Sequence, residues 1–133
     1  MIIITIIKMI TLRLFKTKNF DRFQRKERLK DDDLVEALRE MERGLVDAEL
    51  GGGVYKKRVR SPGKGKSGSY RTLLAVKYND RAIFMYGYPK NTVKKSGKEI
   101  TDKELSALKD MAKVLFEIDL ESNGNSLIEV KYE

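Results

Sequence analysis

The sequence contains no cysteine and no histidine, and these two absences exclude a wide range of chemistry. Without them the chain cannot form a disulfide, a catalytic triad, an imidazole acid–base pair or a cysteine–histidine zinc site. We therefore expect no cofactor and no metal, and catalysis would have to use Lys, Arg, Tyr, Ser or carboxylates. A lack of cysteine is also compatible with the cytoplasm, where we expect the protein to act.

Long apolar segments are absent as well. The run at residues 2–7 ends at Lys8 and is too short to span a bilayer, so we expect a strand and no membrane association. No small-residue cleavage site follows it. One interpretation takes Met9 as the true start and residues 1–8 as an N-terminal extension. The length of 133 residues suits one domain, which we expect to cover residues 1–133.

The positive charge is concentrated in one segment. The chain has 28 Lys and Arg against 20 Asp and Glu, a net charge of +8. Residues 54–78 hold eight cations and no acid, so the cations and acids elsewhere balance. Such a field attracts polyanions, of which nucleic acid is the commonest, although a basic face can also serve solubility alone. The cations of this segment are Lys56, Lys57, Arg58, Arg60, Lys64, Lys66, Arg71 and Lys77.

The periodicity of apolar residues predicts an α+β fold with helices grouped rather than alternating with strands. Strands are expected at residues 10–15, 54–59, 70–78, 81–88 and 126–132, with a hairpin turn at 79–80. Asn19 is the expected N-cap of a first helix, and residues 31–33 begin a second whose apolar face includes Leu45. Thr101 and Glu104 form a capping box for a third helix that ends near residue 120. Two N-terminal helices and one C-terminal helix should pack on an antiparallel sheet of four to five strands.

Strand alternation places Lys56, Arg58 and Arg60 on one face of the sheet. We expect this face to be cationic and the other face to pack on the helices. The loop at residues 63–68 is rich in Gly and Lys but is not a nucleotide-binding P-loop, because Arg60 occupies the position of the first glycine and a strand follows. The glycines at 51–53 are expected to form a flexible turn between helix and sheet.

Several blocks of sequence resemble the RelE/HigB toxins of bacterial type II toxin–antitoxin pairs. They are DAELGGGVYKKRV at 47–59, PGKGKSG at 62–68 and YRTLL at 70–74. Shorter blocks are FKTK at 15–18, KER at 26–28, YGYPKN at 86–91 and KEL at 103–105. The resemblance implies a toxin that cleaves mRNA in the A site of the small ribosomal subunit. It also implies inhibition by a cognate antitoxin, for which we expect a helix-turn-helix protein.

The same resemblance assigns catalytic roles to Lys56, Arg58, Arg71 and Lys90. The charge argument adds Arg60, Lys64 and Lys66 as RNA-binding residues. Many relatives use a tyrosine near the C-terminal helix; this helix has none, and the alternatives are Tyr88, also an expected RNA-binding residue, and Tyr132.

These residue types suit cleavage of RNA by its own 2′-hydroxyl, which needs a base, a proton donor and stabilisation of the phosphorane. Arg58 and Arg71 can chelate phosphate oxygens, and a lysine among like charges, as expected for Lys56, can transfer a proton. Two other functions remain open. One is a ParE-like inhibitor of DNA gyrase, because one fold can host both activities, and the other is an RNA-binding module without catalysis.

Overall fold

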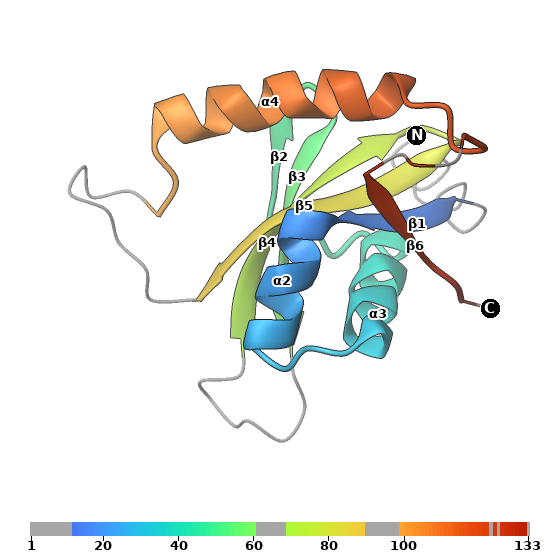
Figure 1. Ribbon diagram of the computed structural model, residues 1–133. Coiled ribbons are helices and arrows are strands. Elements are labelled where there is room, and N and C mark those ends of the chain that lie inside the picture. The colour runs from blue at the N-terminus through green and yellow to red at the C-terminus, as the bar shows by residue number, and fades with distance from the viewer. Residues whose placement is uncertain (1–11, 61–68, 90–98, 123, 125, 133) are drawn as a thin grey trace.

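The computed structural model describes residues 12–60, 69–89, 99–122, 124 and 126–132. A six-stranded sheet forms the middle layer, with strand order β2-β3-β4-β5-β1-β6 (Figure 1). Its strands are β1 (Arg13–Thr17), β2 (Ala48–Gly51), β3 (Val54–Arg60), β4 (Ser69–Lys77), β5 (Arg81–Pro89) and β6 (Leu127–Val130). The helices are α2 (Lys18–Lys26), α3 (Asp31–Glu42) and α4 (Asp102–Glu117). The predicted α+β class is confirmed, with more strands than the four to five expected.

Strands β3 to β5 form the predicted antiparallel meander, and β2 adds antiparallel to β3. The N-terminal strand β1 then adds parallel to β5, and β6 adds antiparallel to β1. The strand that the sequence did not predict is β2. Its glycine-rich end is not a flexible link between helix and sheet, because Gly51, Gly52 and Gly53 make the tight β2–β3 turn with φ of 90°, 63° and 80°. Left-handed backbone of this kind favours glycine.

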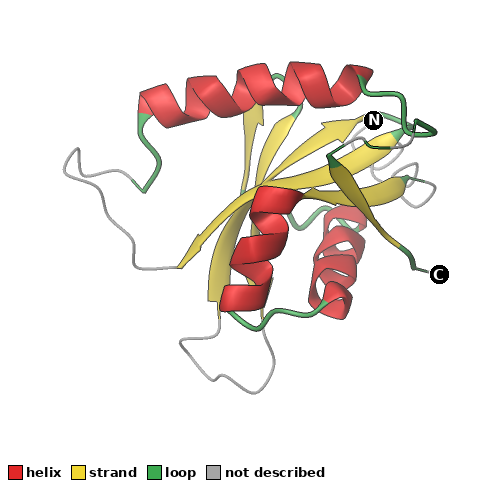
Figure 2. Cartoon of the chain, in the orientation of Figure 1, coloured by secondary structure: helices red, strands yellow, loops and turns green. Residues whose placement is uncertain are grey.

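Helices cover both faces of the sheet (Figure 2). Helices α2 and α3 bury Phe20, Leu34 and Leu38 against one face, and α4 buries Leu108, Ala112 and Leu115 against the other. The expectation that the helices pack only on the face opposite the cations is therefore wrong. Strand β3 places Val54 beneath α4, and Lys56 and Arg58 follow on that same face by strand alternation. Lys56 and Arg58 thus lie on the face that α4 partly covers, further along β3 than Val54.

The observed ends of the helices differ in part from the predicted ones. Thr17, rather than Asn19, caps α2, because its hydroxyl accepts a bond from the amide of Phe20 at 3.0 Å. Helix α3 ends at Glu42, and Gly44 turns the chain with a φ of 90°, so Leu45 lies outside the helix and is 54% exposed. The capping box that begins α4 is confirmed, although this helix ends at Glu117, earlier than predicted.

The C-terminal end of α4 is fixed to the sheet by two cations. Arg81 donates to the carbonyl oxygens of Leu115 and Ile118 at 3.0 and 2.7 Å, and Lys77 donates to that of Phe116 at 3.2 Å. The last turn of α4 has no basic residue of its own. Strands β4 and β5 therefore supply the positive charge that a helix C-terminus favours.

A buried ion cluster holds the other helical layer. The ammonium of Lys16 on β1 lies 2.8 Å from a carboxylate oxygen of Asp21 and 2.9 Å from one of Asp31. It also donates to the side-chain oxygen of Gln24 at 2.9 Å. These contacts tie α2 and the start of α3 to the sheet. Among the described residues, no helix is long and apolar enough to cross a membrane.

Candidate nucleic-acid interface

The strand register aligns three of the predicted site residues in one row. Arg58 on β3 lies opposite Arg71 on β4, and Arg71 lies opposite Tyr88 on β5. Residues opposite each other in a ladder share a face, so all three side chains are on the face that α4 partly covers. Lys56 lies two positions before Arg58 and belongs to the adjacent row, with Leu73 and Tyr86. The meander thus brings Lys56, Arg58, Arg71 and Tyr88 together.

Two arginines directly opposite each other are unfavourable in a sheet unless an anion lies between them. In the part of the chain that the structure describes, neither Arg58 nor Arg71 forms an ion pair with a carboxylate. The terminal nitrogen Nη1 of Arg71 is buried and has no hydrogen-bond partner among the described residues. A buried charged donor without a partner is costly. A phosphate group bound between the two arginines would relieve their repulsion.

The structure adds a carboxylate that the sequence analysis missed. Glu99 Oε1 accepts from the ammonium of Lys56 at 3.2 Å and from the hydroxyl of Tyr88 at 3.4 Å. The premise that Lys56 stands among cations alone is therefore wrong. The sequence signal that could have indicated Glu99 is its position two residues before the helix cap Thr101. The start of α4 brings this position to the sheet. Lys56, Tyr88 and Glu99 are called the Glu99 triad below.

Tyr88 remains protonated at neutral pH. Burial raises its pKa to about 12, and the negative charge of Glu99 contributes in the same direction. The positive charge of Arg71 lowers the pKa but does not outweigh these effects. Only 4% of Tyr88 is exposed, so its hydroxyl serves as a hydrogen-bond donor held within the site.

A cavity of about 330 Å³ adjoins the Glu99 triad, between the sheet and the start of α4. All three triad side chains line it. The remainder of its lining is apolar and consists of Leu50, Leu73, Ile100 and Leu105. An apolar floor with a few polar groups is typical of sites that bind small or flat ligands.

The remaining predicted residues fall into three groups. Arg60 is exposed at the end of β3, opposite Ser69 and on the face of Arg58. Lys64, Lys66 and Lys90 lie outside the described residues. Tyr132 lies on the opposite face, where it packs against the core beneath α2 and α3 and donates to the carbonyl oxygen of Leu12.

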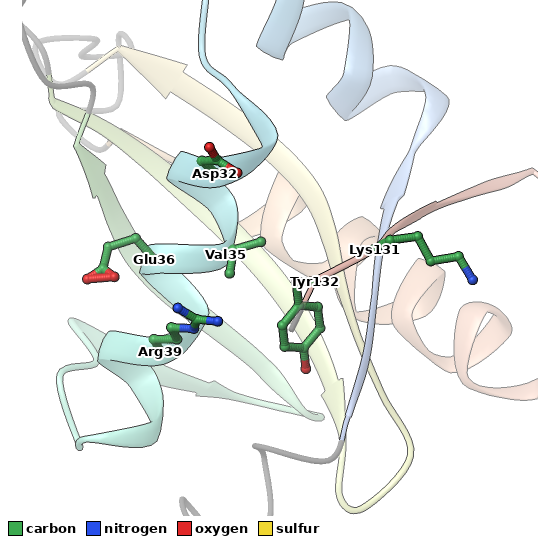
Figure 3. A pocket seen from close by; sticks show the side chains of 6 residues that line it. All are labelled: Asp32, Val35, Glu36, Arg39, Lys131 and Tyr132. Carbon is green, nitrogen blue, oxygen red and sulfur yellow. The ribbon is translucent and has the colours of Figure 1, made fainter.

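Figure 3 shows Tyr132 and Lys131 of the C-terminal segment beside Asp32, Val35, Glu36 and Arg39 of α3. These six residues line a hollow of about 250 Å³. Since the sheet separates Tyr132 from the arginine row, the structure does not support Tyr132 as the tyrosine of the site. Tyr88 is the tyrosine that the fold brings to it.

Two cations of the basic segment have structural roles. The ammonium of Lys57 points to the opposite face and contacts Glu40 of α3 at 2.7 Å, where only 5% of the lysine side chain is exposed. Lys77 binds the end of α4. The basic segment is thus divided between anchoring helices and forming the candidate surface.

The family model described as the RelE toxin of the RelE/RelB toxin–antitoxin system matches residues 12–130. No curated protein matches the chain. The match spans every strand and helix described above.

Proposed function

Because the chain belongs to the RelE toxin family of RelE/RelB toxin–antitoxin systems, we propose that it is a ribosome-dependent endoribonuclease that cleaves mRNA in the A site of the small subunit. The observation that carries this proposal is the row of Arg58, Arg71 and Tyr88, in which Arg71 has a buried terminal nitrogen without a hydrogen-bond partner among the described residues. A toxin that acts on RNA needs a phosphate-binding site of this kind. A membership in this family also implies an antitoxin partner.

Arg58 and Arg71 bind the scissile phosphate and stabilise the negative charge that develops on the phosphorane. Arginine stays protonated and can donate two parallel hydrogen bonds to phosphate oxygens. Because the two side chains project from paired strands, their separation is set by the sheet before RNA binds. Preorganised donors of this type commonly give the largest single contribution to a rate enhancement.

Lys56 transfers a proton during the cleavage step, and Lys90 is assigned to catalysis by the family resemblance. Arg60, Lys64 and Lys66 contact the RNA backbone on either side of the scissile phosphate. Tyr88 lies in the same row on β5 and supports the RNA-binding surface through its hydrogen bond to Glu99. The reaction is proposed to need no metal, since the 2′-hydroxyl is the nucleophile and the cations stabilise the charge.

The proposed antitoxin is a helix-turn-helix protein that covers this basic face in growing cells. A partner with an acidic contacting segment would neutralise Arg58 and Arg71 in the absence of RNA. Co-expression with the product of the adjacent gene provides the test. Loss of toxicity together with co-purification supports the pairing, and persistent toxicity with no complex contradicts it.

The central experiment expresses wild-type protein and Arg71→Ala in cells and maps transcript ends. Wild type should arrest growth and cut transcripts within translated codons, and Arg71→Ala should lower the rate of cutting by about 10²- to 10³-fold, as expected for loss of one charge-stabilising donor. Arg43→Ala, at an exposed position beyond α3, is the matched control and should retain wild-type cutting. Growth arrest with intact transcripts contradicts the proposal, and gyrase-dependent DNA damage would then indicate a ParE-like activity.

A further inference from the structure

Glu99 contacts two residues of the proposed site, Lys56 and Tyr88. Its Oε1 atom lies 3.2 Å from the ammonium of Lys56 and 3.4 Å from the hydroxyl of Tyr88. The side chain is 28% exposed, so a substrate can reach it although it is held by two donors. The capping box formed by Thr101 and Glu104 fixes the backbone two residues later. The carboxylate is therefore placed by the sheet and by α4 at once.

We propose that Glu99 is the general base of RNA cleavage and that Lys56, in direct contact with it, is the general acid. The inference rests on the proposed endoribonuclease function. It assigns the acid–base pair from the contacts of Glu99 with Lys56 and Tyr88 and from chemical type, since a carboxylate accepts a proton and an ammonium group donates one. A carboxylate base also explains how the site can work without histidine.

The proton transfers balance within this pair. Glu99 removes the proton of the 2′-hydroxyl as the 2′-oxygen forms its bond to phosphorus. The bond between phosphorus and the 5′-oxygen breaks, and Lys56 gives a proton to that oxygen, which leaves as a hydroxyl. The products are a 2′,3′-cyclic phosphate and a free 5′-hydroxyl. The proton on Glu99 then passes to Lys56 across their 3.2 Å contact, which restores both groups.

Tyr88 acts as a positioning residue in this scheme. Its hydroxyl donates to the same oxygen of Glu99 that Lys56 contacts, and both it and Glu99 line the adjoining cavity. Burial keeps the hydroxyl protonated, as its raised pKa shows, so it remains a donor throughout the reaction. Tyr88→Phe should lower the cleavage rate less than removal of Glu99 does.

A purely structural role for Glu99 is the competing explanation, because an ion pair with Lys56 could simply hold α4 on the sheet. The variant Glu99→Gln separates the two roles. Its amide oxygen can still accept hydrogen bonds from Lys56 and Tyr88, but it cannot take up a proton at neutral pH. Glu99→Asp retains the carboxylate on a shorter side chain. Glu117→Gln, at the far and exposed end of α4, is the control for loss of one negative charge.

The first measurement is single-turnover cleavage of mRNA on programmed ribosomes at saturating ribosome concentration. Glu99→Gln should lower the rate by about 10²- to 10⁴-fold, the usual contribution of a general base, without changing the half-saturating ribosome concentration. Glu99→Asp should cleave faster than Glu99→Gln but more slowly than wild type, and Glu117→Gln should cleave at the wild-type rate. Wild-type rates in Glu99→Gln would overturn the inference and leave the proposed function standing. An inactive wild-type protein would instead remove the proposed function, and the inference with it.

The second measurement assigns base and acid separately with an mRNA that carries sulfur in place of the bridging 5′-oxygen at the cleavage site. A thiolate is a much weaker base than an alkoxide and leaves without a proton, so the need for a general acid disappears. This substrate should restore cleavage by Lys56→Met and should leave Glu99→Gln impaired. Restoration of Glu99→Gln instead would overturn its role as the base.

Discussion

Replacing Arg71 by methionine should make the protein more stable while it abolishes function. The guanidinium nitrogen Nη1 of Arg71 is buried without a hydrogen-bond partner among the described residues, and Arg58 lies directly opposite. Methionine keeps the apolar length of the side chain and removes both the buried donor and the like-charge contact.

The expected gain follows from these two features. Removing a buried unsatisfied polar group returns about 1–3 kcal/mol, and relief of a cross-strand repulsion adds about 0.2–1 kcal/mol. We expect the free energy of unfolding of Arg71→Met to rise by at least about 1 kcal/mol, which corresponds to an increase of ~2–8 °C in melting temperature. The assay is urea unfolding followed by circular dichroism, in buffer free of phosphate and nucleic acid, because both anions would bind Arg71 in the wild type.

Arg58→Met provides the matched control, since it relieves the same repulsion at an exposed position with no buried donor. The free energy of unfolding of Arg58→Met should rise only by the amount gained from relief of the repulsion. It should remain below that of Arg71→Met. An Arg71→Met protein no more stable than wild type, with an unchanged dependence on urea, would refute the reasoning. It would mean that the guanidinium is well satisfied in the folded chain. A gain in stability on loss of Arg71 is the pattern expected if this position is kept for the proposed function.

Three further predictions concern the scaffold. Gly53→Ala should lower the free energy of unfolding by about 1–3 kcal/mol in the same urea assay, because a Cβ would lie 2.9 Å from the ring of Phe116 at a φ of +80°. An unchanged midpoint would contradict this geometry. Thr101→Ala should cost about 1 kcal/mol by loss of the α4 cap and should also slow RNA cleavage, which a purely local effect on the helix would not do. Arg13 lowers the pKa of Glu129 from 4.5 to about 2, so this pair stabilises the fold fully above pH 4.5 and progressively less as the pH falls toward 2. In Glu129→Gln, acid titration of stability between these two values should be shallower than in wild type, and identical curves would refute the assignment.

Local signals in the sequence were sufficient for most of the elements. The Thr101–Glu104 capping box and the turn at residues 79–80 depend on neighbouring residues only, and both are present. Strand β2 was missed because its four residues lack β-branched side chains and are held by pairing with β3. The parallel pairing of β1 with β5 is a contact between distant segments, which periodicity does not encode.

The candidate site was predictable where it depends on the alternation of side chains along a strand. Alternation placed Lys56 and Arg58 on one face, and the antiparallel register then brought Arg71 opposite Arg58. Which face α4 covers could not be predicted, because an amphipathic helix shows that it packs but not on which side of a sheet. Glu99 was missed for the same reason, since it reaches Lys56 only through the placement of α4.

The anchoring of α4 at both ends makes its length a condition for the proposed activity. Arg81 and Lys77 hold its last turn, and Glu99 meets Lys56 just before its first. Sixteen helical residues span about 24 Å, and each residue turns the helix by about 100°. One inserted residue near the middle of α4 would therefore rotate Glu99 away from the sheet even if the helix remained folded. The β4–β5 hairpin lies at the opposite end of these strands from the arginine row. By holding the last turn of α4, it fixes the rotation of the helix about its axis and so the direction in which Glu99 points.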